Sequence, residues 1–347
     1  MKQASVFSND PWGRLHSLLE QKRYSKIYVV CDENTEKYCL PFFHSIVSFS
    51  YDSFCIPSGE QNKNLTQLEL LAAQLIQKSV DRNSLLIALG GGVVCDLVNF
   101  CASVLLRGID SVLIPTSLMA MCDAAIGGKT AVNLLNYKNQ IGTFYSAQGI
   151  LFDPIFLESL DERNLKNGFV EMVKHSLIES PPYIQDFLSL GWPVEKDLLK
   201  SLIKKSIRSK TEIIEQDPTE LGLRKILNYG HTIGHAIESV CISRKEDILH
   251  GEAVAIGMVA ESYISSKMFG WKNHIIEQIS EYLKFFFPMN INIEGKETEI
   301  IDALSFDKKN EMGKIQFVLL EKPGSPVRDQ KVSVELILGA LNYVKNC

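Results

Sequence analysis

The chain lacks the features that would place it outside ordinary globular enzymes. Its 347 residues carry a formal net charge of −5, so there is no excess of positive charge of the kind that binds nucleic acid. The eight cysteines are scattered and form no Cys-x-x-Cys pair. Cys55 and Cys101 lie inside apolar runs, so we expect reduced core thiols and a cytoplasmic protein. We find no internal repeat and no low-complexity segment.

Long apolar runs are also missing. The most apolar stretch, residues 84–106, is interrupted by three glycines, Asp96 and Asn99, so we do not expect a membrane span. The first ten residues contain no apolar run, and a secretory signal is not expected either. What remains is a hydrophobic content of 46% and a charged content of 22%, which are typical of globular proteins, in a chain long enough for two domains.

The pattern of apolar residues divides the chain near residue 155. Before it, short apolar or β-branched runs at 26–32, 53–57, 84–90, 111–115 and 149–153 alternate with helical patterns such as 65–80. That alternation predicts an α/β domain with a parallel sheet, and the almost wholly apolar run at 84–90 predicts a strand covered on both faces.

After residue 155 the periodicity is helical. We predict helices at 162–179, 195–215, 220–241, 251–269, 274–286, 297–305 and 333–345, with one hairpin around 313–323. The predicted domains are therefore a nucleotide-binding α/β domain at 1–155 and a mainly helical domain at 156–347. We expect the active site in the cleft between them.

The stretch 224–235 is the most informative segment. On one helix, Arg224, Asn228, His231 and His235 would share a stripe, because they are spaced four, three and four residues apart. Asn, His and the neighbouring glycines are poor helix formers, which indicates selection for function, with a solvated face that carries incidental histidines as the alternative. Two histidines four residues apart can share a metal ion, or one can bind metal while the other transfers protons.

A glycine-rich turn follows the apolar strand and opens a helix, at Gly90-Gly-Gly-Val-Val-Cys-Asp96. Glycines let the backbone approach a pyrophosphate, and the helix N-terminus offers free N–H groups. It is not the Rossmann G-x-G-x-x-G pattern. Asp32, at the end of the first predicted strand, and the nearby Asn34 are candidates to hydrogen-bond a nucleoside.

A second glycine-containing segment runs from Asp123 to Asn133 and includes Lys129. It resembles a Walker A loop only superficially, because Asp123 occupies the position of the first glycine. We interpret it as a loop that binds phosphate or a polyol, with an ordinary surface loop as the alternative. Lys138 and Asn139 follow shortly afterwards.

Three further residues complete the candidate chemistry. Glu171 and Lys174 lie one helical turn apart, and the simplest interpretation of that pair alone is a surface ion pair. His250 begins another predicted helix. Glu171, His231 and His250 together would provide a carboxylate and two imidazoles, a set that suits zinc with an open coordination position.

These motifs together resemble the sugar phosphate cyclases and, within them, the 3-dehydroquinate synthase family. The matching segments run in order over nearly the whole chain, at 58–63, 90–96, 107–108, 115–117, 123–133, 138–142, 171–174, 224–238, 249–252 and 307–309. Departures are Cys95 and Asn99 near the glycine-rich turn, and Ala124-Ala125 where serines are common. The departures adjoin the proposed functional side chains and replace none of them.

The resemblance implies an NAD- and zinc-dependent enzyme, with Co²⁺ as a possible substitute metal. Its substrate would be 3-deoxy-D-arabino-heptulosonate 7-phosphate (DAHP), converted to 3-dehydroquinate and phosphate in the shikimate pathway. The expected sequence is oxidation of a ring hydroxyl, loss of phosphate, reduction by the same NADH, ring opening and aldol closure. A homodimer is implied, with no nucleic-acid or membrane partner.

The resemblance also implies residue roles. Zinc would be held by Glu171, His231 and His250, while His235 would relay protons with help from Glu220. The substrate would be gripped by Lys129, Asn139, Lys174, Lys210, Arg224, Asn228 and Lys308 or Lys309, with Arg107 reaching in from the partner subunit. NAD would be bound by Asp32, Asn34, Glu60, Lys63, Gly91, Gly92, Val93, Asp96, Thr116, Ser117, Lys129, Lys138 and Asn167. Asp123 would lie where cofactor and substrate meet.

Three alternatives remain open on these residues. A related cyclase would make a valiolone or a deoxy-inosose, although His235 and the run Asp307-Lys308-Lys309 favour dehydroquinate. A metal-dependent polyol dehydrogenase would release NADH at each turnover. An inactive NAD-binding or scaffold protein would be expected to have lost a zinc ligand or Lys129, and none is lost.

Overall fold

The computed structural model describes residues 10–135, 137–287, 293–306 and 315–346. The chain forms two compact units. The first unit contains Met1–Leu165 with Ile203–Glu215, and the second contains Lys166–Leu202 with Gln216–Cys347. Among the described residues, the helices are all too short or too polar to cross a bilayer.

The first unit is built on a parallel sheet of five strands in the order β2-β1-β3-β4-β7. The strands are β1 (Ile27–Asp32), β2 (Asp52–Ile56), β3 (Leu85–Gly90), β4 (Asp110–Pro115) and β7 (Gly149–Ile150). Every residue of β3 is buried, as its continuous apolar run predicts for a central strand covered on both faces. The prediction of a parallel α/β sheet is confirmed.

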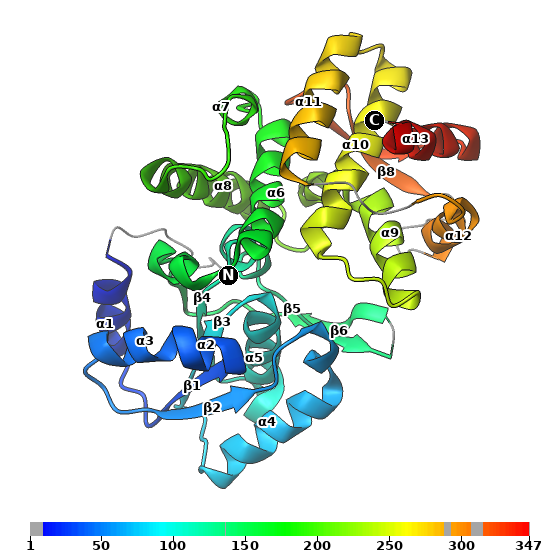
Figure 1. Ribbon diagram of the computed structural model, residues 1–347. Coiled ribbons are helices and arrows are strands. Elements are labelled where there is room, and N and C mark those ends of the chain that lie inside the picture. The colour runs from blue at the N-terminus through cyan, green and yellow to red at the C-terminus, as the bar shows by residue number, and fades with distance from the viewer. Residues whose placement is uncertain (1–9, 136, 288–292, 307–314, 347) are drawn as a thin grey trace. The chain divides into compact units, whose positions relative to one another are not determined.

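Helices and one hairpin complete this unit, in blue to green in Figure 1. Helix α5 (Gly92–Val104) starts at the end of β3 and packs on β1, β3 and β4. The remaining elements are α1 (Pro11–Gln21), α2 (Glu33–Tyr38), α3 (Leu40–Ile46), α4 (Leu65–Gln77), four short turns of helix (η1, Glu60–Asn62; η2, Leu105–Arg107; η3, Ala120–Ala124; η4, Pro154–Ser159) and the antiparallel pair β5 (Lys129–Leu134) and β6 (Tyr137–Phe144).

The second unit is mainly helical, as predicted. Its central helix α10 (His250–Phe269) packs against α9 (His231–Ser243), α11 (Asn273–Phe286), α13 (Val334–Asn346) and β8 (Gln316–Leu320). The other elements are α6 (Glu162–Ile178) and α8 (Lys196–Gln216), which each have residues in both units, and α7 (Gln185–Leu188), η5 (Leu223–Asn228), α12 (Glu297–Phe306) and β9 (Pro326–Lys331).

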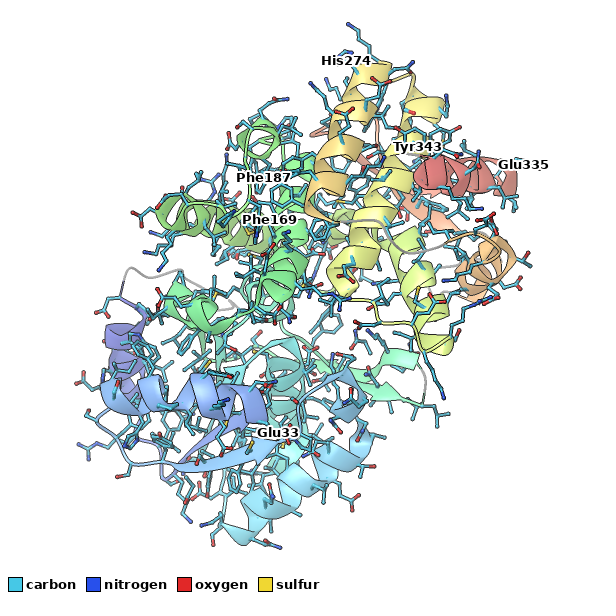
Figure 2. All side chains as sticks on the ribbon, in the orientation of Figure 1. Glu33, Phe169, Phe187, His274, Glu335 and Tyr343 are labelled. Atoms are coloured by element: carbon cyan, nitrogen blue, oxygen red, sulfur yellow. The ribbon has the colours of Figure 1, made fainter. Side chains whose placement is uncertain are left out.

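An aromatic cluster fixes α6 in the second unit. The rings of Phe169 and Phe187, both labelled in Figure 2, lie 5.4 Å apart, and Phe169 stacks on Phe286 at 5.0 Å. All three rings are buried. Aromatic burial of this kind dominates core energetics, so it holds α6 firmly and, with it, Glu171 two residues after Phe169.

Three predictions of local structure were wrong, and the predicted hairpin was correct in kind but not in extent. The helix predicted at 220–241 is two elements, η5 and α9, because Gly230 adopts a left-handed φ of +79° between them. Lys129, which was predicted to lie in a loop, is the first residue of strand β5, which pairs with β6. The hairpin predicted at 313–323 lies partly outside the described residues, and its second strand, β9, comes later. Cys55 is exposed because β2 is an edge strand.

Candidate functional site

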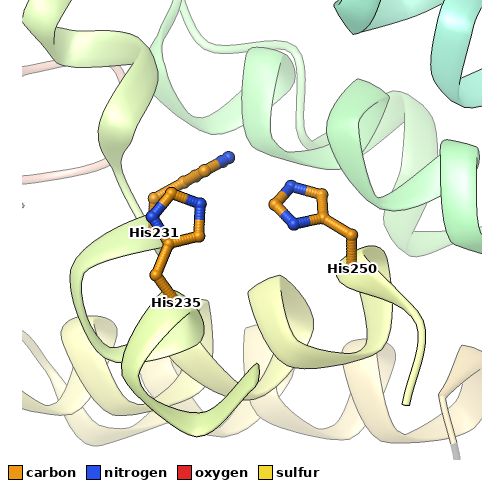
Figure 3. Close-up of side chains that lie close together, drawn as sticks. All are labelled: His231, His235 and His250. Carbon is orange, nitrogen blue, oxygen red and sulfur yellow. The ribbon is translucent and has the colours of Figure 1, made fainter. Parts of the chain in front are cut away.

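Three histidine side chains of the second unit face one another (Figure 3). His231 and His235 project from the first two turns of α9, and His250 is the first residue of α10. Their ring centroids are 5.1 to 5.5 Å apart, and one nitrogen from each ring lies within 4.8 Å of the other two. Three imidazoles converging from two helices form an arrangement that suits a divalent metal.

Glu171 lies beside this histidine cluster. Its side chain is fully buried on α6, and its Oε1 is 3.4 Å from Nε2 of His231. Lys174 forms an ion pair with Oε2, yet neither oxygen accepts a well-oriented hydrogen bond within the described part of the chain. A buried carboxylate without full hydrogen bonding is costly unless a cation compensates it. The interpretation of Glu171 and Lys174 as a surface pair is therefore wrong, because both side chains are buried.

Hydrogen bonds set the tautomers of two of the histidines. Nδ1 of His231 lies 3.1 Å from the carbonyl oxygen of Tyr229, and Nδ1 of His250 lies 3.2 Å from Oε2 of Glu238. A carbonyl or an ionised carboxylate only accepts, so Nδ1 carries the proton in both rings. The neutral rings then present the Nε2 lone pair for coordination. In His231 that lone pair faces the Glu171 carboxylate, and two acceptors 3.4 Å apart require a cation or proton between them.

The start of α9 is held by a buried carboxylate on α10. Glu261 accepts hydrogen bonds from the backbone N–H groups of Gly230, at 2.6 Å, and Ile233, at 3.0 Å. Gly230 has no room for a side chain, because a Cβ there would lie 2.4 Å from Met258. These contacts end the preceding 3₁₀ turn and restart the chain as α9, so Arg224 and Asn228 do not share a helical stripe with His231 and His235.

The turn before α9 carries two of the predicted substrate residues, Arg224 and Asn228, and Glu220, which was predicted to assist proton relay. Arg224 is buried, and its guanidinium donates to the carbonyl oxygen of Pro218 at 2.7 Å. The side-chain amide of Asn228 donates to Glu220 at 2.8 Å. Asp217 organises this turn by accepting from the N–H groups of Leu221, Gly222 and Arg224.

In the first unit, the direction in which successive strands are added to the sheet reverses between β1 and β3. The chain runs from β1 to β2 on one side and from β3 to β4 on the other, so the carboxyl ends of β1 and β3 flank a topological switch point. Asp32 ends β1, and the turn from Gly90 to Gly92 ends β3. Ligands of open α/β sheets bind at this crevice. The two motifs singled out in the sequence therefore lie at the carboxyl ends of neighbouring strands.

The glycines of this turn differ in the space around them. A Cβ at Gly90 would lie 2.5 Å from the side chain of Val94, whereas at Gly91 the nearest group is Oγ of Ser117, at 3.5 Å. Gly91 therefore leaves its backbone open to a ligand. Asp32 caps α2 by accepting from the N–H and hydroxyl of Thr35, at 2.8 and 2.9 Å.

A buried lysine links several predicted cofactor residues. Nζ of Lys63 lies 2.5 Å from Oδ2 of Asp96 and donates to Oδ1 of Asn139 at 2.7 Å. Burial opposes the charge of Lys63, but Asp96 and Glu60 outweigh it and raise its pKa. Burial raises the pKa of Asp96 despite the neighbouring Lys63. The network extends through Asn133, which accepts from the Asn139 N–H and donates to Glu60.

A second buried lysine contacts the segment that begins at Asp123. Lys210, on α8, donates to the backbone carbonyl of Asp123 at 2.7 Å and forms an ion pair with its carboxylate. Both residues belong to the first unit. Lys129 is exposed at the start of β5.

The other predicted residues lie at varied positions. Arg107 is exposed with a φ of +70°, and Asn34 is exposed on α2. The side chain of Asn167 accepts from the N–H of Gly251 at 2.6 Å, beside His250. Val93, Lys138 and Ser117 are half-buried, Thr116 is buried, and Lys308 and Lys309 lie outside the described residues.

Sequence reasoning missed three supporting residues, namely Glu238, Glu261 and Asn133. Glu238 orients His250, Glu261 caps α9, and Asn133 joins Asn139 to Glu60. For the two glutamates a signal was present, since each is an acidic residue in an otherwise apolar helical run. A charge in such a run is rarely buried unless it is paired.

The fold is shared with two sugar phosphate cyclases of known structure. One is 2-epi-5-epi-valiolone synthase from Streptomyces hygroscopicus subsp. jinggangensis, solved with NAD⁺ and Zn²⁺, with a TM-score of 0.89 at 23% identity over 100% of this chain and 97% of that one. The other is 2-deoxy-scyllo-inosose synthase, solved with carbaglucose-6-phosphate, NAD⁺ and Co²⁺, with a TM-score of 0.81 at 23% identity over 98% and 96% of the two chains.

Sequence comparison identifies the family within this fold. Residues 53–167 match the 3-dehydroquinate synthase N-terminal family and residues 168–310 match its C-terminal counterpart. The chain is 37% identical over 346 residues to the 3-dehydroquinate synthase of Parabacteroides distasonis, covering 99% of this chain and 98% of that protein. The chain belongs to the 3-dehydroquinate synthase family.

Proposed function

We propose that the chain converts DAHP to 3-dehydroquinate and phosphate, as a carbon–oxygen lyase of the shikimate pathway that uses NAD and one divalent metal. Zn²⁺ is the expected metal, and Co²⁺ can substitute. The observation that carries the proposal is the buried carboxylate of Glu171 facing Nε2 of His231 beside two further imidazoles. The curated relatives of this chain are 3-dehydroquinate synthases, which supports this reaction over the other cyclases.

Glu171, His231 and His250 would hold the metal. Glu171 supplies a negative charge, and Nδ1 of each histidine is engaged by a hydrogen bond that leaves Nε2 as the ligand atom. Bound NAD would supply reversible hydride transfer, and the metal would supply the positive charge that polarises the hydroxyl being oxidised. His235 is the proposed proton carrier, because its ring adjoins both metal-binding rings on the same helix or the next.

The substrate carries a carboxylate, a phosphate and several hydroxyls, which require cations and amide groups. Lys174, Arg224 and Asn228 are the proposed binding residues of the second unit, with Glu220 holding the Asn228 amide in place. Lys210, Lys129 and Asn139 are those of the first unit, together with Lys308 or Lys309. A bidentate guanidinium such as Arg224 suits a carboxylate or phosphate particularly well.

NAD would bind at the switch point of the first unit. The open backbone at Gly91 and the start of α5, which includes Gly92 and Val93, suit the pyrophosphate, and Asp32 with Asn34 suits the ribose. The remaining proposed contacts are Glu60, Lys63, Asp96, Thr116, Ser117, Lys129, Lys138 and Asn167, with Asp123 where cofactor and substrate meet.

A cytoplasmic homodimer is the proposed assembly. Arg107 is exposed with its backbone in the left-handed region, a strained conformation that is often retained at functional sites. It would contribute to the partner's substrate site. The seven cysteines in the described part of the chain are free thiols, which supports a reducing compartment.

The proposal is tested by incubating the full chain with DAHP, limiting NAD and Zn²⁺, and measuring phosphate and NADH together. We expect phosphate in many-fold excess over NAD with no accumulation of NADH. The hydride taken from the substrate would be returned to the intermediate derived from it, so NAD would not be consumed. A chelator should abolish the reaction and Zn²⁺ should restore it. Stoichiometric NADH accumulation would establish a dehydrogenase instead, and absence of phosphate release with saturating DAHP would overturn the proposed reaction.

A further inference from the structure

A separate cluster of potential metal ligands lies at the edge of the sheet in the first unit. Cys31 on β1 and Cys55 on β2 are directly paired in the parallel register of these strands. Glu36 lies on α2, the helix that follows β1. The two sulfur atoms and a carboxylate oxygen of Glu36 all lie within 4.8 Å of one another.

We propose that Cys31, Cys55 and Glu36 form a second metal site, which binds a thiophilic divalent cation such as Zn²⁺ with its fourth position open to water. The three ligands come from three different elements. Cys31 is buried, whereas Cys55 and Glu36 are exposed, so an ion could enter from solvent and bind against a buried thiol. Nothing in the proposed reaction uses these residues.

The distances suit a tetrahedral ion. Zn–S bonds of about 2.3 Å place tetrahedral sulfur ligands about 3.8 Å apart. The observed upper limit of 4.8 Å exceeds this by about one ångström, which rotation of the exposed Cys55 and Glu36 side chains can close. Cys31 contacts the backbone carbonyl of Phe54 at 3.7 Å, and Cys55 contacts that of Ile56 at 3.8 Å. The Cys55 side chain also interacts with those of Cys31 and Glu36, so the three proposed ligands already contact one another.

The charge around the pair also favours a cation. The carboxylates of Glu36 and Asp32 act on both thiols, and Glu33, labelled in Figure 2 on the first turn of α2, acts on Cys55. A cation bound between the two sulfur atoms would offset this concentration of negative charge and stabilise both thiolates.

An ion here would fasten together β1, β2 and α2. Helix α2 starts at its Asp32 cap, directly after Cys31. The site would therefore stabilise this edge of the sheet in a metal-dependent way, because binding to the folded state alone raises stability by mass action.

The test uses the reduced full chain titrated with Cd²⁺ and observed at the ultraviolet thiolate-to-metal charge-transfer band. Only a site with sulfur ligands gives this band, so metal at Glu171, His231 and His250 does not contribute. We expect a saturable band that is lost in Cys55→Ser and kept in Cys101→Ser, a buried cysteine of α5 outside the cluster. Glu36→Gln should keep the band but weaken Cd²⁺ binding by at least about tenfold.

Two results would overturn the site. One is a band that is absent, or unchanged in Cys55→Ser. The other is a disulfide in place of the metal site. It would appear as two fewer titratable thiols in the metal-free wild type, which a reductant would recover, with no such deficit in Cys55→Ser. Cys55 is exposed, so its substitution leaves the core intact, and circular dichroism checks the folding of each variant.

Discussion

The roles of the individual histidines depend on which nitrogen of each ring is engaged. His231 and His250 are each oriented through Nδ1 by a buried acceptor, the Tyr229 carbonyl and the Glu238 carboxylate. These hydrogen bonds fix ring orientation and increase ligand basicity, which is how residues outside a coordination sphere control metal affinity. The three rings are mutually close, and His235 is the proposed proton carrier beside the two proposed metal ligands.

Substitution of His231 and His235 separates metal binding from proton transfer. We expect His231→Asn to lose zinc and activity together. His235→Asn should keep near-stoichiometric zinc while phosphate release slows about 10²- to 10⁴-fold, the usual contribution of an acid–base group. Metal analysis beside single-turnover rates makes the distinction. Loss of zinc from the His235 variant would mean that the roles are assigned wrongly.

Glu238 is predicted to control metal affinity without touching the metal. In Glu238→Gln the Nδ1 proton of His250 loses its charged acceptor, so zinc affinity should fall about 10- to 100-fold while the fold is retained. Competition with a chromogenic chelator measures the change. Glu246→Gln is the matched control, because Glu246 pairs with Lys296 away from the histidines. Equal affinities in the two variants would contradict the positioning role.

At the scale of elements, glycines bring α9 and α10 into backbone contact. A Cβ at Gly257 would lie 2.0 Å from the carbonyl oxygen of Gly230, and one at Gly234 would lie 3.0 Å from that of Ala253. Helices can approach this closely only where side chains are absent. The close approach brings Glu261 within hydrogen-bond distance of the α9 N-terminus. It therefore fixes the position of His231, the first residue of α9, relative to α10.

Two glycine-to-alanine changes test this packing. Gly257→Ala should destabilise the fold by about 1–3 kcal/mol, because the methyl group meets backbone that cannot move aside cheaply. Gly339→Ala, in α13, places its Cβ 3.5 Å from Tyr263 and should stabilise by up to about 1 kcal/mol through helix propensity. Urea unfolding measures both. Similar free energies of unfolding in the two variants would contradict the close-packing argument.

The contribution of the turn from Asp217 to Arg224 to the stability of the fold should depend on pH. Burial opposes the charge of Asp217, but the N–H groups of Arg224, Gly222 and Leu221 outweigh it and lower its pKa. A lowered pKa contributes stability above the unfolded value of about 3.9, and that contribution is lost as pH falls through the folded pKa. Asp217→Asn should therefore be less stable than wild type at neutral pH, with a gap that narrows in acid. A difference in urea midpoint that stays constant with pH would contradict this assignment.

At the scale of the whole molecule, the proposed dimer predicts complementation between two inactive variants. If Arg107 acts in the partner's site, a mixed dimer of Arg107→Ala and His250→Ala subunits contains one complete site. Random mixing should then restore roughly a quarter of wild-type activity, since half of the dimers are mixed and each has one site of two. The control is each variant alone, carried through the same exchange. Equally low activity before and after mixing, with exchange shown by mass spectrometry, would place Arg107 outside the partner's site.

Periodicity and composition determined most of the architecture. Continuous apolar runs predicted the central parallel strands, which are covered on both faces. The ends of long helices such as α6, α10 and α13 were predicted to within one residue. The glycine-rich turn and Asp32 were also readable, since the carboxyl ends of parallel strands meet at one edge of a sheet. The family was recognisable because its motifs are local in sequence and keep their order.

Tertiary contacts decided the rest. The break at Gly230 follows from Met258 and Glu261 on another helix, and no local propensity encodes those partners. The burial of Glu171 and Lys174, the Glu238–His250 hydrogen bond and the exposure of Cys55 likewise depend on which element packs against which. Sequence spacing specifies which side chains share a face of one element, whereas desolvation and the pairing of charges depend on neighbours that only the folded chain brings together.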